Sequence, residues 1–247
     1  MAKELTAGII GAGRIGRLHA QHLSKRIEGV RVKTVSDVIL DAAESCAKEY
    51  GIPNAVKDAG EIMNDGEIDF VVICSSTDTH ATFMQQAAER GKHIFCEKPI
   101  ALDLDEIDRV LGVVEKAGVK LQIGFNRRFD ANFARMAQLV REGKIGEPHI
   151  LRITSRDPAP PPIEYVKVSG GIFLDMMIHD FDMARFLVGS EVEEVYTNGA
   201  VKVDPAIGEA GDVYTAIVAR KFENGGICTI DNSRKAVYGY DQRAEVF

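Results

Sequence analysis

The stretch Ala7-Gly8-Ile9-Ile10-Gly11-Ala12-Gly13-Arg14-Ile15-Gly16 decides the fold of the first half of the chain. A short apolar run ends in a GxGxxG pattern, and a helical spacing of apolar residues opens directly after it. Gly11 permits the tight turn, Gly13 lets backbone amides approach a pyrophosphate, and Gly16 lets the helix pack close to the strand. Arg14 and Ile15 open this helix, whose N-terminus offers free N–H groups to phosphate. This context favours a bound dinucleotide over the alternative, a glycine-rich turn without a ligand.

An acidic residue follows the second predicted strand, residues 30–35. Asp37 lies 21 residues beyond Gly16, about where a carboxylate binds the ribose hydroxyls of an adenosine. Such a carboxylate repels a 2′-phosphate, and residues 38–43 contain no Arg or Lys that would neutralise one. The sequence therefore predicts NAD rather than NADP as cofactor. The alternative is that Asp37 only caps the following turn.

Apolar runs and helical patterns alternate over the first 124 residues, as in a parallel sheet covered on both faces. The predicted strands lie at residues 7–10, 30–35, 69–74, 93–96 and 120–123, the last counted as the sixth, with helices at 41–50, 59–63 and 103–117 and a helix ending at Arg90. Six strands alternating with helices predict a complete doubly wound sheet of the α/β class. Residues 1–124 are therefore expected to form a nucleotide-binding domain.

Polar side chains follow the strand at residues 69–74, at the edge where open α/β sheets bind ligands. Ser75, Thr77 and His80 could border the cofactor there. Alternatively, Thr77 or Asp78 is only the N-cap of the next helix, and the two interpretations are compatible. The strand at 93–96 ends in Glu97-Lys98-Pro99, where the stiff Lys–Pro bond fixes a lysine at the same edge.

The pattern changes after residue 124. A helix is predicted at residues 130–142, followed by β-rich runs at 149–155, 192–203, 213–221 and 226–232. Strand after strand with few helices between them predicts an α+β domain with a largely antiparallel sheet over residues 125–247. Residues 157–162, Asp-Pro-Ala-Pro-Pro-Pro, should form a loop, either a wall of a substrate site or a mere spacer.

An acid and a histidine in this second half are four residues apart. Asp175 and His179 would share one face of a helix, and a carboxylate beside an imidazole raises its basicity and fixes its tautomer. Such a pair can act as general base for an alcohol proton. The alternative, favoured for the pair in isolation, is a surface pair or a core histidine with satisfied nitrogens.

Composition excludes several classes of function. The formal net charge of −7 argues against nucleic acid as the main partner, and no apolar run approaches the roughly 20 residues that span a bilayer. The four cysteines form no CxxC pair, so neither a disulfide framework nor a zinc site is expected. The first residues lack the apolar core of a signal peptide, which together with the cysteine pattern predicts a cytoplasmic protein.

Four stretches together resemble the Gfo/Idh/MocA family of NAD(P)-dependent oxidoreductases and, within it, most resemble the inositol 2-dehydrogenases. They are residues 7–16, 95–99, 124–129 and 170–182. The resemblance extends from Ala7 to Phe247. It implies a Rossmann domain followed by a substrate-binding domain whose open sheet commonly serves oligomerisation, so a homo-oligomer, dimer or tetramer, is expected.

The resemblance also assigns roles to residues. His179 would take the hydroxyl proton, Asp175 would orient it, and Lys98 would stabilise the developing alkoxide. The implied cofactor-binding residues are Gly11, Gly13, Arg14, Ile15, Gly16, Asp37, Ser75, Thr77, His80, Glu97 and Lys98. The implied substrate-binding residues are Lys98, Asn126, Arg127, Asp157, Asp175, His179 and Tyr240. No metal is required, because the nicotinamide accepts the hydride.

The implied reaction is NAD-dependent oxidation of a cyclic polyol, myo-inositol before others, to 2-keto-myo-inositol. Related scyllo-inositol or sugar dehydrogenases are the first alternative. A non-catalytic NAD-binding sensor or corepressor of the same fold is the second. Family members usually continue beyond the point where this chain stops, so the second sheet is expected to be incomplete, with an edge or apolar face that invites association.

Overall fold

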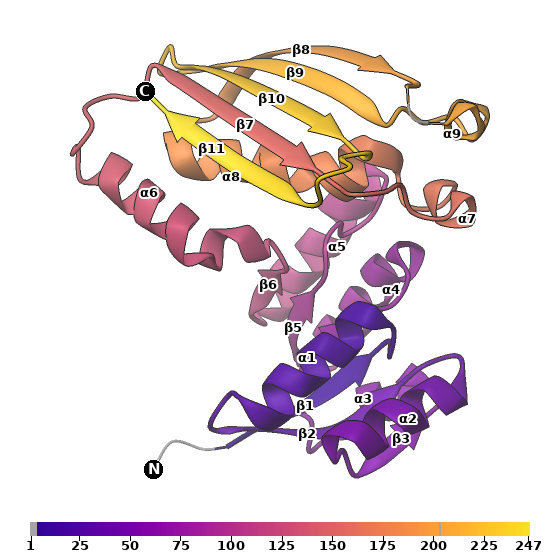
Figure 1. Cartoon of the computed structure of the whole chain (residues 1–247). Coiled ribbons are helices and arrows are strands. Elements are labelled where there is room, and N and C mark those ends of the chain that lie inside the picture. Colours follow the sequence, from indigo (N-terminus) through magenta and orange to yellow (C-terminus); the bar gives the residue numbers. More distant parts are fainter. Residues whose placement is uncertain (1–3, 203) are drawn as a thin grey trace. The chain divides into compact units, whose positions relative to one another are not determined.

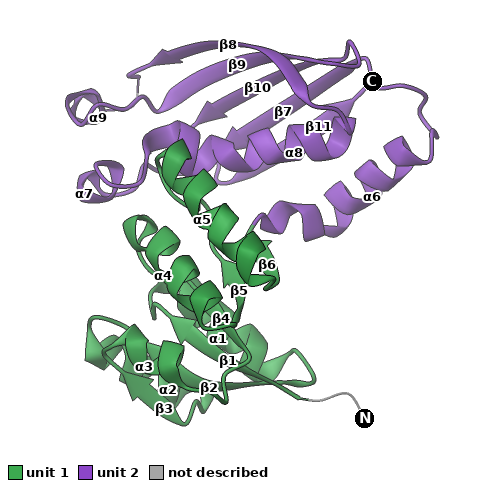
Figure 2. Ribbon diagram, turned by 180° about the vertical axis from the view of Figure 1, so that it is seen from behind, with its two compact units in different colours: residues 1–124 green, residues 125–247 purple. Residues whose placement is uncertain are grey.

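The computed structural model describes residues 4–202 and 204–247. Residues 1–3, and Val203 at the end of one predicted strand, lie outside the described residues. Figure 1 shows the order of the elements along the chain. The chain divides into two compact units, Met1–Gly124 and Phe125–Phe247 (Figure 2).

The first unit is a parallel sheet of six strands in the order β3-β2-β1-β4-β5-β6. Its elements are β1 (Leu5–Ile10), α1 (Arg14–Lys25), β2 (Val30–Ser36), α2 (Leu40–Tyr50), β3 (Asn54–Val56), α3 (Ala59–Asn64), β4 (Phe70–Ile73), α4 (Thr77–Glu89), β5 (His93–Cys96), α5 (Leu104–Ala117) and β6 (Leu121–Ile123). Every neighbouring pair of strands runs parallel. The prediction of a doubly wound parallel sheet is confirmed.

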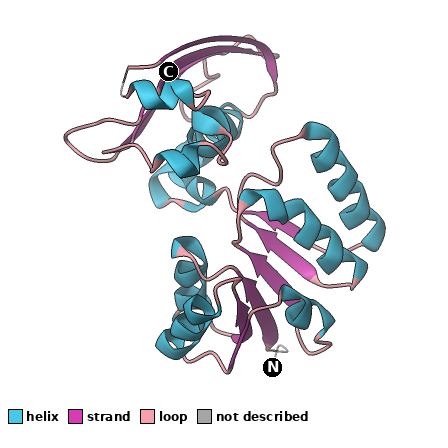
Figure 3. Ribbon diagram, turned by 90° about the vertical axis from the view of Figure 1, so that its right-hand side faces the viewer, coloured by secondary structure: helices cyan, strands magenta, loops and turns pink. Residues whose placement is uncertain are grey.

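Helices cover both faces of this sheet (Figure 3). Alternate residues of β4 separate the two layers: Val72 packs with α1 and α2 in one buried cluster, whereas Val71 and Ile73 pack with α3, α4 and α5 in another. Because both faces are buried, the strands read as continuous apolar runs rather than as alternating ones. Only β3, with three residues, was absent from the predicted runs; it is too short to show a pattern.

The strand order reverses between β1 and β4. From β1 the chain adds β2 and β3 on one side, and then returns to add β4, β5 and β6 on the other. The carboxyl ends of β1 and β4 therefore lead into connections that run in opposite directions. In open α/β sheets the ligand binds at this switch point, which places the first glycine-rich turn and residues 74–80 at the expected edge.

The second unit is a five-stranded mixed sheet in the order β11-β7-β10-β9-β8. Its elements are the 3₁₀ helix η1 (Asn126–Phe129), α6 (Ala131–Arg141), β7 (Ile150–Arg156), α7 (Ile163–Val166), the π-helix η2 (Ile172–Met177), α8 (Ile178–Val188), β8 (Val192–Ala200), α9 (Pro205–Glu209), β9 (Thr215–Phe222), β10 (Ile227–Ser233) and β11 (Asp241–Val246). Three neighbouring pairs are antiparallel, and β7 and β10 are parallel. The predicted largely antiparallel sheet is confirmed.

One face of this second sheet is buried beneath helices. Figure 1 shows α6 and α8 on the same side of the strands, where alternate residues such as Leu151, Val218 and Ile230 form one core with Met183 and Leu187 of α8. The last strand, β11, pairs with β7 and adds two further side chains to this core. The other face of the sheet carries exposed residues.

Candidate active site

The glycine-rich turn after β1 is built as the motif predicts. Gly11 has φ +99°, and a Cβ on it would lie 2.5 Å from the carbonyl oxygen of Cys74. A Cβ on Gly16 would lie 1.9 Å from the carbonyl oxygen of Gly11, so the close approach of α1 to the turn requires glycine. A Cβ on Gly13, in contrast, would meet no described atom within 4 Å.

The N-terminus of α1 fits a phosphate group. Gly13 is its N-cap, and among the described residues no side chain caps the first turn. Arg14 and Ile15 form that first turn, Arg14 exposed and Ile15 half-buried. Open space beside Gly13 and backbone N–H groups without a side-chain cap match the needs of a pyrophosphate.

Asp37 joins this turn to the end of β2. Its Oδ2 accepts a hydrogen bond from the backbone N–H of Ala12 at 2.7 Å, and its Oδ1 accepts one from Ile39 at 2.9 Å. The second bond is the turn-capping role considered for this residue. Because an ionised carboxylate offers about four lone-pair positions, Asp37 can still accept bonds from a ribose.

The predicted site residues after β4 differ in their hydrogen-bond partners and in their burial. Ser75 Oγ lies 2.6 Å from Thr79 Oγ1, and Thr77 is the first residue of α4, whose N-cap is Ser76 rather than Thr77 or Asp78. His80 is buried, and its ring nitrogens lie 2.7 Å from the carbonyl oxygen of Pro99 and 3.1 Å from that of Ser75. His80 therefore ties the exit of β4 to the exit of β5.

Glu97 follows β5 and is held by the first helix of the same unit. Its Oε1 lies 2.8 Å from Nε2 of His19, whose ring packs against Phe95 with centroids 4.9 Å apart. A Cβ on Gly124 would lie 2.9 Å from the other oxygen of Glu97. Lys98 is half-buried, and its bond to Pro99 is cis. His19 was not among the predicted site residues; its signal is a histidine three residues after the last glycine of the motif.

In the second unit, η1 is fastened to α8 by two arginine–aspartate pairs. Arg127 pairs with Asp180, which is fully buried and also accepts bonds from Ser155 Oγ at 2.6 Å and from the amide of Asn232 at 2.7 Å. The pairing occupies part of the predicted substrate ligand Arg127, while Asn126, at the start of η1, is exposed.

The second of these pairs is a two-bond fork. Nε and Nη2 of Arg128 donate to the two oxygens of Asp182 at 2.8 and 2.5 Å. Asp182 is thus bound by an arginine of η1. Together the pairs fix the first turn of α8, which carries His179.

Asp175 and His179 lie on one continuous helical segment. Asp175 belongs to the π-helix η2 and His179 to the start of α8, so the spacing of four residues places them on a shared face. Phe125 presents its ring edge-on to His179, at 6.3 Å between centroids and 87° between planes. π-turns within helices often mark functional sites.

A buried arginine that sequence reasoning missed holds Asp175. Arg234 Nη2 donates to Asp175 Oδ2 at 2.5 Å, and Tyr165 donates its hydroxyl to Asp175 Oδ1 at 2.9 Å. Nε of Arg234 lies 3.7 Å from Asp157 Oδ2. Arg234 thus joins two predicted site residues, Asp157 and Asp175, whereas Tyr240 is 74% exposed in the turn before β11.

Burial sets the electrostatics of Asp157. Burial raises the pKa of Asp157, and the carboxylates of Asp175 and Asp180 raise it further, while Arg234 and Arg127 oppose the shift. Two carboxylates close together favour the neutral form of one of them unless a cation lies between them. Arg234 is that cation.

The described residues include neither a membrane-spanning helix nor a cluster of metal ligands. No described helix has both the length and the apolar character needed to cross a membrane. In the same part of the chain, no three His, Cys, Asp or Glu side chains are grouped as metal ligands would be.

Comparison with known families accounts for both units. The family described as "Oxidoreductase family, NAD-binding Rossmann fold" matches residues 5–125, and the "GFO/IDH/MocA C-terminal domain" matches residues 133–247. The chain belongs to the Gfo/Idh/MocA oxidoreductase family. The resemblance inferred from the four motifs is confirmed, and the first unit is an NAD-binding Rossmann domain.

The chain is also similar, over nearly its whole length, to individual proteins named inositol dehydrogenases. A myo-inositol 2-dehydrogenase of Thermotoga maritima is 53% identical over 240 residues, which are 97% of this chain and 72% of that protein. An inositol 2-dehydrogenase of Rhizobium meliloti is 49% identical over 239 residues, again 97% of this chain and 72% of the relative. The crystal structure of scyllo-inositol dehydrogenase from Lactobacillus casei with NAD(H) and scyllo-inositol matches with a TM-score of 0.91 at 32% identity, covering 99% of this chain and 74% of that one.

Proposed function

We propose that this oxidoreductase oxidises one secondary hydroxyl of myo-inositol to the ketone with NAD. The observation that carries this proposal is the 49–53% identity, over 97% of the chain, to proteins named inositol 2-dehydrogenases. The tight glycine turn, Asp37 and the arginine-held Asp175 near His179 support the same reaction. The products are one ketone, one NADH and one proton.

The protein's own residues handle the oxygen and its proton. His179 takes the hydroxyl proton, and Asp175, held on both oxygens, keeps the imidazole oriented and stabilises its charged form. Lys98 donates a hydrogen bond to the reacting oxygen and stabilises negative charge as it develops. The chemistry that bound NAD would supply is that of an acceptor for the hydride of the carbinol carbon.

Binding of NAD in the first unit follows from the turn after β1. The N-terminus of α1 would hold the pyrophosphate, and Asp37 would accept hydrogen bonds from the adenosine ribose and repel a 2′-phosphate. Ser75 and Thr77 would border the cofactor, and Glu97 would lie near the nicotinamide ribose. His80 acts indirectly, because both of its ring nitrogens already face backbone carbonyl oxygens.

The substrate ligands beyond the catalytic residues are Asn126, Arg127, Asp157 and Tyr240. A ring of hydroxyls needs donors and acceptors on several sides to fix which carbon reacts. The 32% identity to a scyllo-inositol dehydrogenase keeps that isomer as the second candidate substrate. A non-catalytic sensor is disfavoured because Lys98, Asp175 and His179 are all retained.

A substrate panel with two variants tests the proposal. Purified protein is mixed with NAD or NADP and with myo-inositol, scyllo-inositol or glucose, and NADH or NADPH is followed by its absorbance. We expect the highest kcat/KM with myo-inositol and NAD. Lys98→Ala and His179→Ala should each lower kcat by about 100-fold or more while NAD binding, measured by calorimetry, is retained. NAD binding without turnover of any polyol by the unmodified chain would contradict the enzyme proposal.

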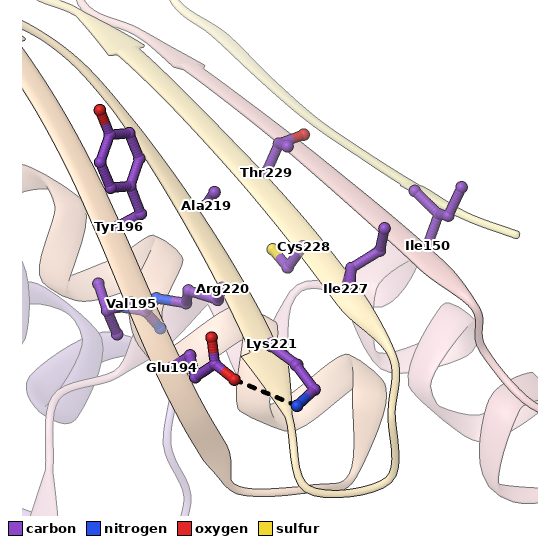
Figure 4. Close-up of a pocket in the computed structure, with 10 residues that line it drawn as sticks. All are labelled: Ile150, Glu194, Val195, Tyr196, Ala219, Arg220, Lys221, Ile227, Cys228 and Thr229. Carbon is purple, nitrogen blue, oxygen red and sulfur yellow. Dashed lines mark hydrogen bonds and ion pairs between the residues drawn. The ribbon is translucent and has the colours of Figure 1, made fainter.

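We also propose that copies of the chain associate through the open face of the second sheet. Figure 4 shows this face, where Ile150, Tyr196 and Ile227 stand beside Ala219 and Thr229 on neighbouring strands. Ile150, Tyr196 and Ile227 are 41%, 68% and 51% exposed. An apolar face of this kind is typical of an interface between subunits.

We further propose that the protein lies in the cytoplasm, where its four free cysteines would stay reduced.

A further inference from the structure

The position of Arg234 follows from the pairing of two strands in the second sheet. Among the described strands of this sheet, only one neighbouring pair is parallel. β7 and β10 run parallel, with Arg156 opposite Ser233, so the residues that follow them leave the sheet at the same edge. Those residues are Asp157 and Arg234, and the N–H of Asp157 donates to the carbonyl of Ser233 at 3.1 Å. The register of the two parallel strands thereby places Asp157 beside Arg234 as a charged pair.

The guanidinium of Arg234 is almost entirely removed from water. Its side chain is 3% exposed, its backbone N–H donates to the carbonyl of Tyr214 at 3.1 Å, and its Cζ lies 5.0 Å from the centre of the Tyr214 ring. A buried cation is costly unless it is paired and hydrogen-bonded. Asp175 at 2.5 Å and Asp157 at 3.7 Å supply the opposite charge.

We propose that Arg234 is a positioning residue for the reaction: it fixes the carboxylate of Asp175 in its ionised form and divides its charge between Asp175 and Asp157. The inference rests on the proposed function, since it explains how Asp175 comes to serve His179. Arginine suits the task because its planar fork can address two carboxylates, whereas the compact ammonium of lysine cannot span both.

The groups that face Asp175 determine whether removal of Arg234 raises or lowers the pKa of Asp175. Tyr165 from α7 donates to one oxygen, Arg234 from the end of β10 to the other, and Asp157 lies beyond Arg234. His179 follows on the same helix. Removing Arg234 takes away a positive charge that lies beside both carboxylates, so the pKa of Asp175 should rise.

Activity that requires ionised Asp175 is present above the pKa of Asp175 and lost as the pH falls through it. Loss of Arg234 therefore moves the acid limb of the kcat/KM profile to higher pH. Loss of the Asp157 charge has the opposite effect, because Asp175 then has Arg234 to itself and one like charge fewer. A purely structural role for Arg234 would lower the amount of folded protein without moving the limb.

The test compares Arg234→Gln, Arg234→Lys and Asp157→Asn, with Arg185→Gln as matched control. Arg185 also makes a two-bond pair with a carboxylate, Glu191, but on the surface of α8. The pKa of Asp175 is measured by carbon NMR of side-chain carboxyls in the protein without cofactor, with Asp175→Asn identifying the signal. The pH profile of kcat/KM for myo-inositol and the thermal midpoint are measured beside it.

We expect Arg234→Gln to raise the pKa of Asp175 and the acid limb by about one pH unit or more, and to lower kcat by about 10- to 100-fold. Compared with Arg234→Gln, Arg234→Lys should show little of this rise in pKa and should recover only part of kcat. Asp157→Asn should move the pKa and the limb downward, and Arg185→Gln should move neither.

An unchanged pKa of Asp175 in Arg234→Gln would overturn the inference. Should that variant fail to fold, Asp157→Asn decides: a lower pKa supports the inference and an unchanged one contradicts it. If the unmodified chain forms no NADH, the proposed function fails. The carboxyl titration still tests whether Arg234 keeps Asp175 ionised.

Discussion

Asp37 binds two backbone N–H groups with its two carboxylate oxygens, one from the glycine-rich turn and one from the turn that follows β2. It therefore shapes the turn, and in the proposed mode of NAD binding its negative charge would lie where the cofactors NAD and NADP differ. The two interpretations left open by the sequence are compatible, because the backbone bonds use only part of the carboxylate's capacity.

Asp37→Ala should relax the preference for NAD. We expect the ratio of kcat/KM for NAD to that for NADP to fall by about tenfold or more, since about 1.4 kcal/mol of discrimination corresponds to a factor of ten. Initial rates with both cofactors measure this. The matched control is Asp58→Ala, which removes another backbone-bound carboxylate, the N-cap of α3. It should cost about 1 kcal/mol of stability and leave the ratio unchanged. An unchanged ratio in Asp37→Ala would reduce Asp37 to a turn residue.

Residues with a local signal were predictable, and those joined by tertiary contacts were not. Gly11 and Gly16 follow from one motif, and Asp37 from its spacing to that motif. Arg234 lies 59 residues from Asp175 along the chain, and nothing in its own neighbourhood marks it. It could have been found only by knowing that β7 and β10 are parallel.

The connection between η1 and α8 rests on two arginine–aspartate pairs that differ in burial. Side chains of Arg127 and Asp180 are 11% and 0% exposed, whereas those of Arg128 and Asp182 are 39% and 8% exposed. Removing one partner of a buried pair strands the other charge, which costs far more than breaking a pair that water can reach.

Asp180→Asn should therefore destabilise the protein more than Asp182→Asn. We expect losses of about 3 kcal/mol or more for the first and about 1 kcal/mol for the second, from urea unfolding of the protein without cofactor. Both variants are isosteric and change the same helix, so each serves as control for the other. Equal losses would contradict the larger cost expected for the more deeply buried pair.

The sequence predicted elements where the pattern was long enough to read. The buried strands of the first unit and the long helix α5 follow from composition and periodicity. The three-residue strand β3 and the short helices α7 and α9 carry too little pattern. The π-turn of η2 was not predicted from the sequence, and the parallel pairing of β7 with β10 departs from an otherwise antiparallel sheet.

At the scale of the whole molecule, the proposed association of chains depends on the open face of the second sheet. Ile227→Lys places a charge among exposed apolar residues of that face. We expect the molar mass in sedimentation to fall toward that of a single 27.0 kDa chain. The control Val237→Lys, at a valine that is 95% exposed outside the strands, should leave the mass unchanged. An Ile227→Lys variant with the unmodified mass would place the interface elsewhere.

The transfer of hydride from a polyol carbon to NAD is tested most directly by isotope. Myo-inositol carrying deuterium on every ring carbon is incubated with the protein and NAD, and the reduced cofactor is isolated and weighed by mass spectrometry. The proposed reaction predicts NADH that carries one deuterium, formed by the unmodified chain and almost absent with His179→Ala. Reduced cofactor without deuterium, or equal amounts from both proteins, would contradict it.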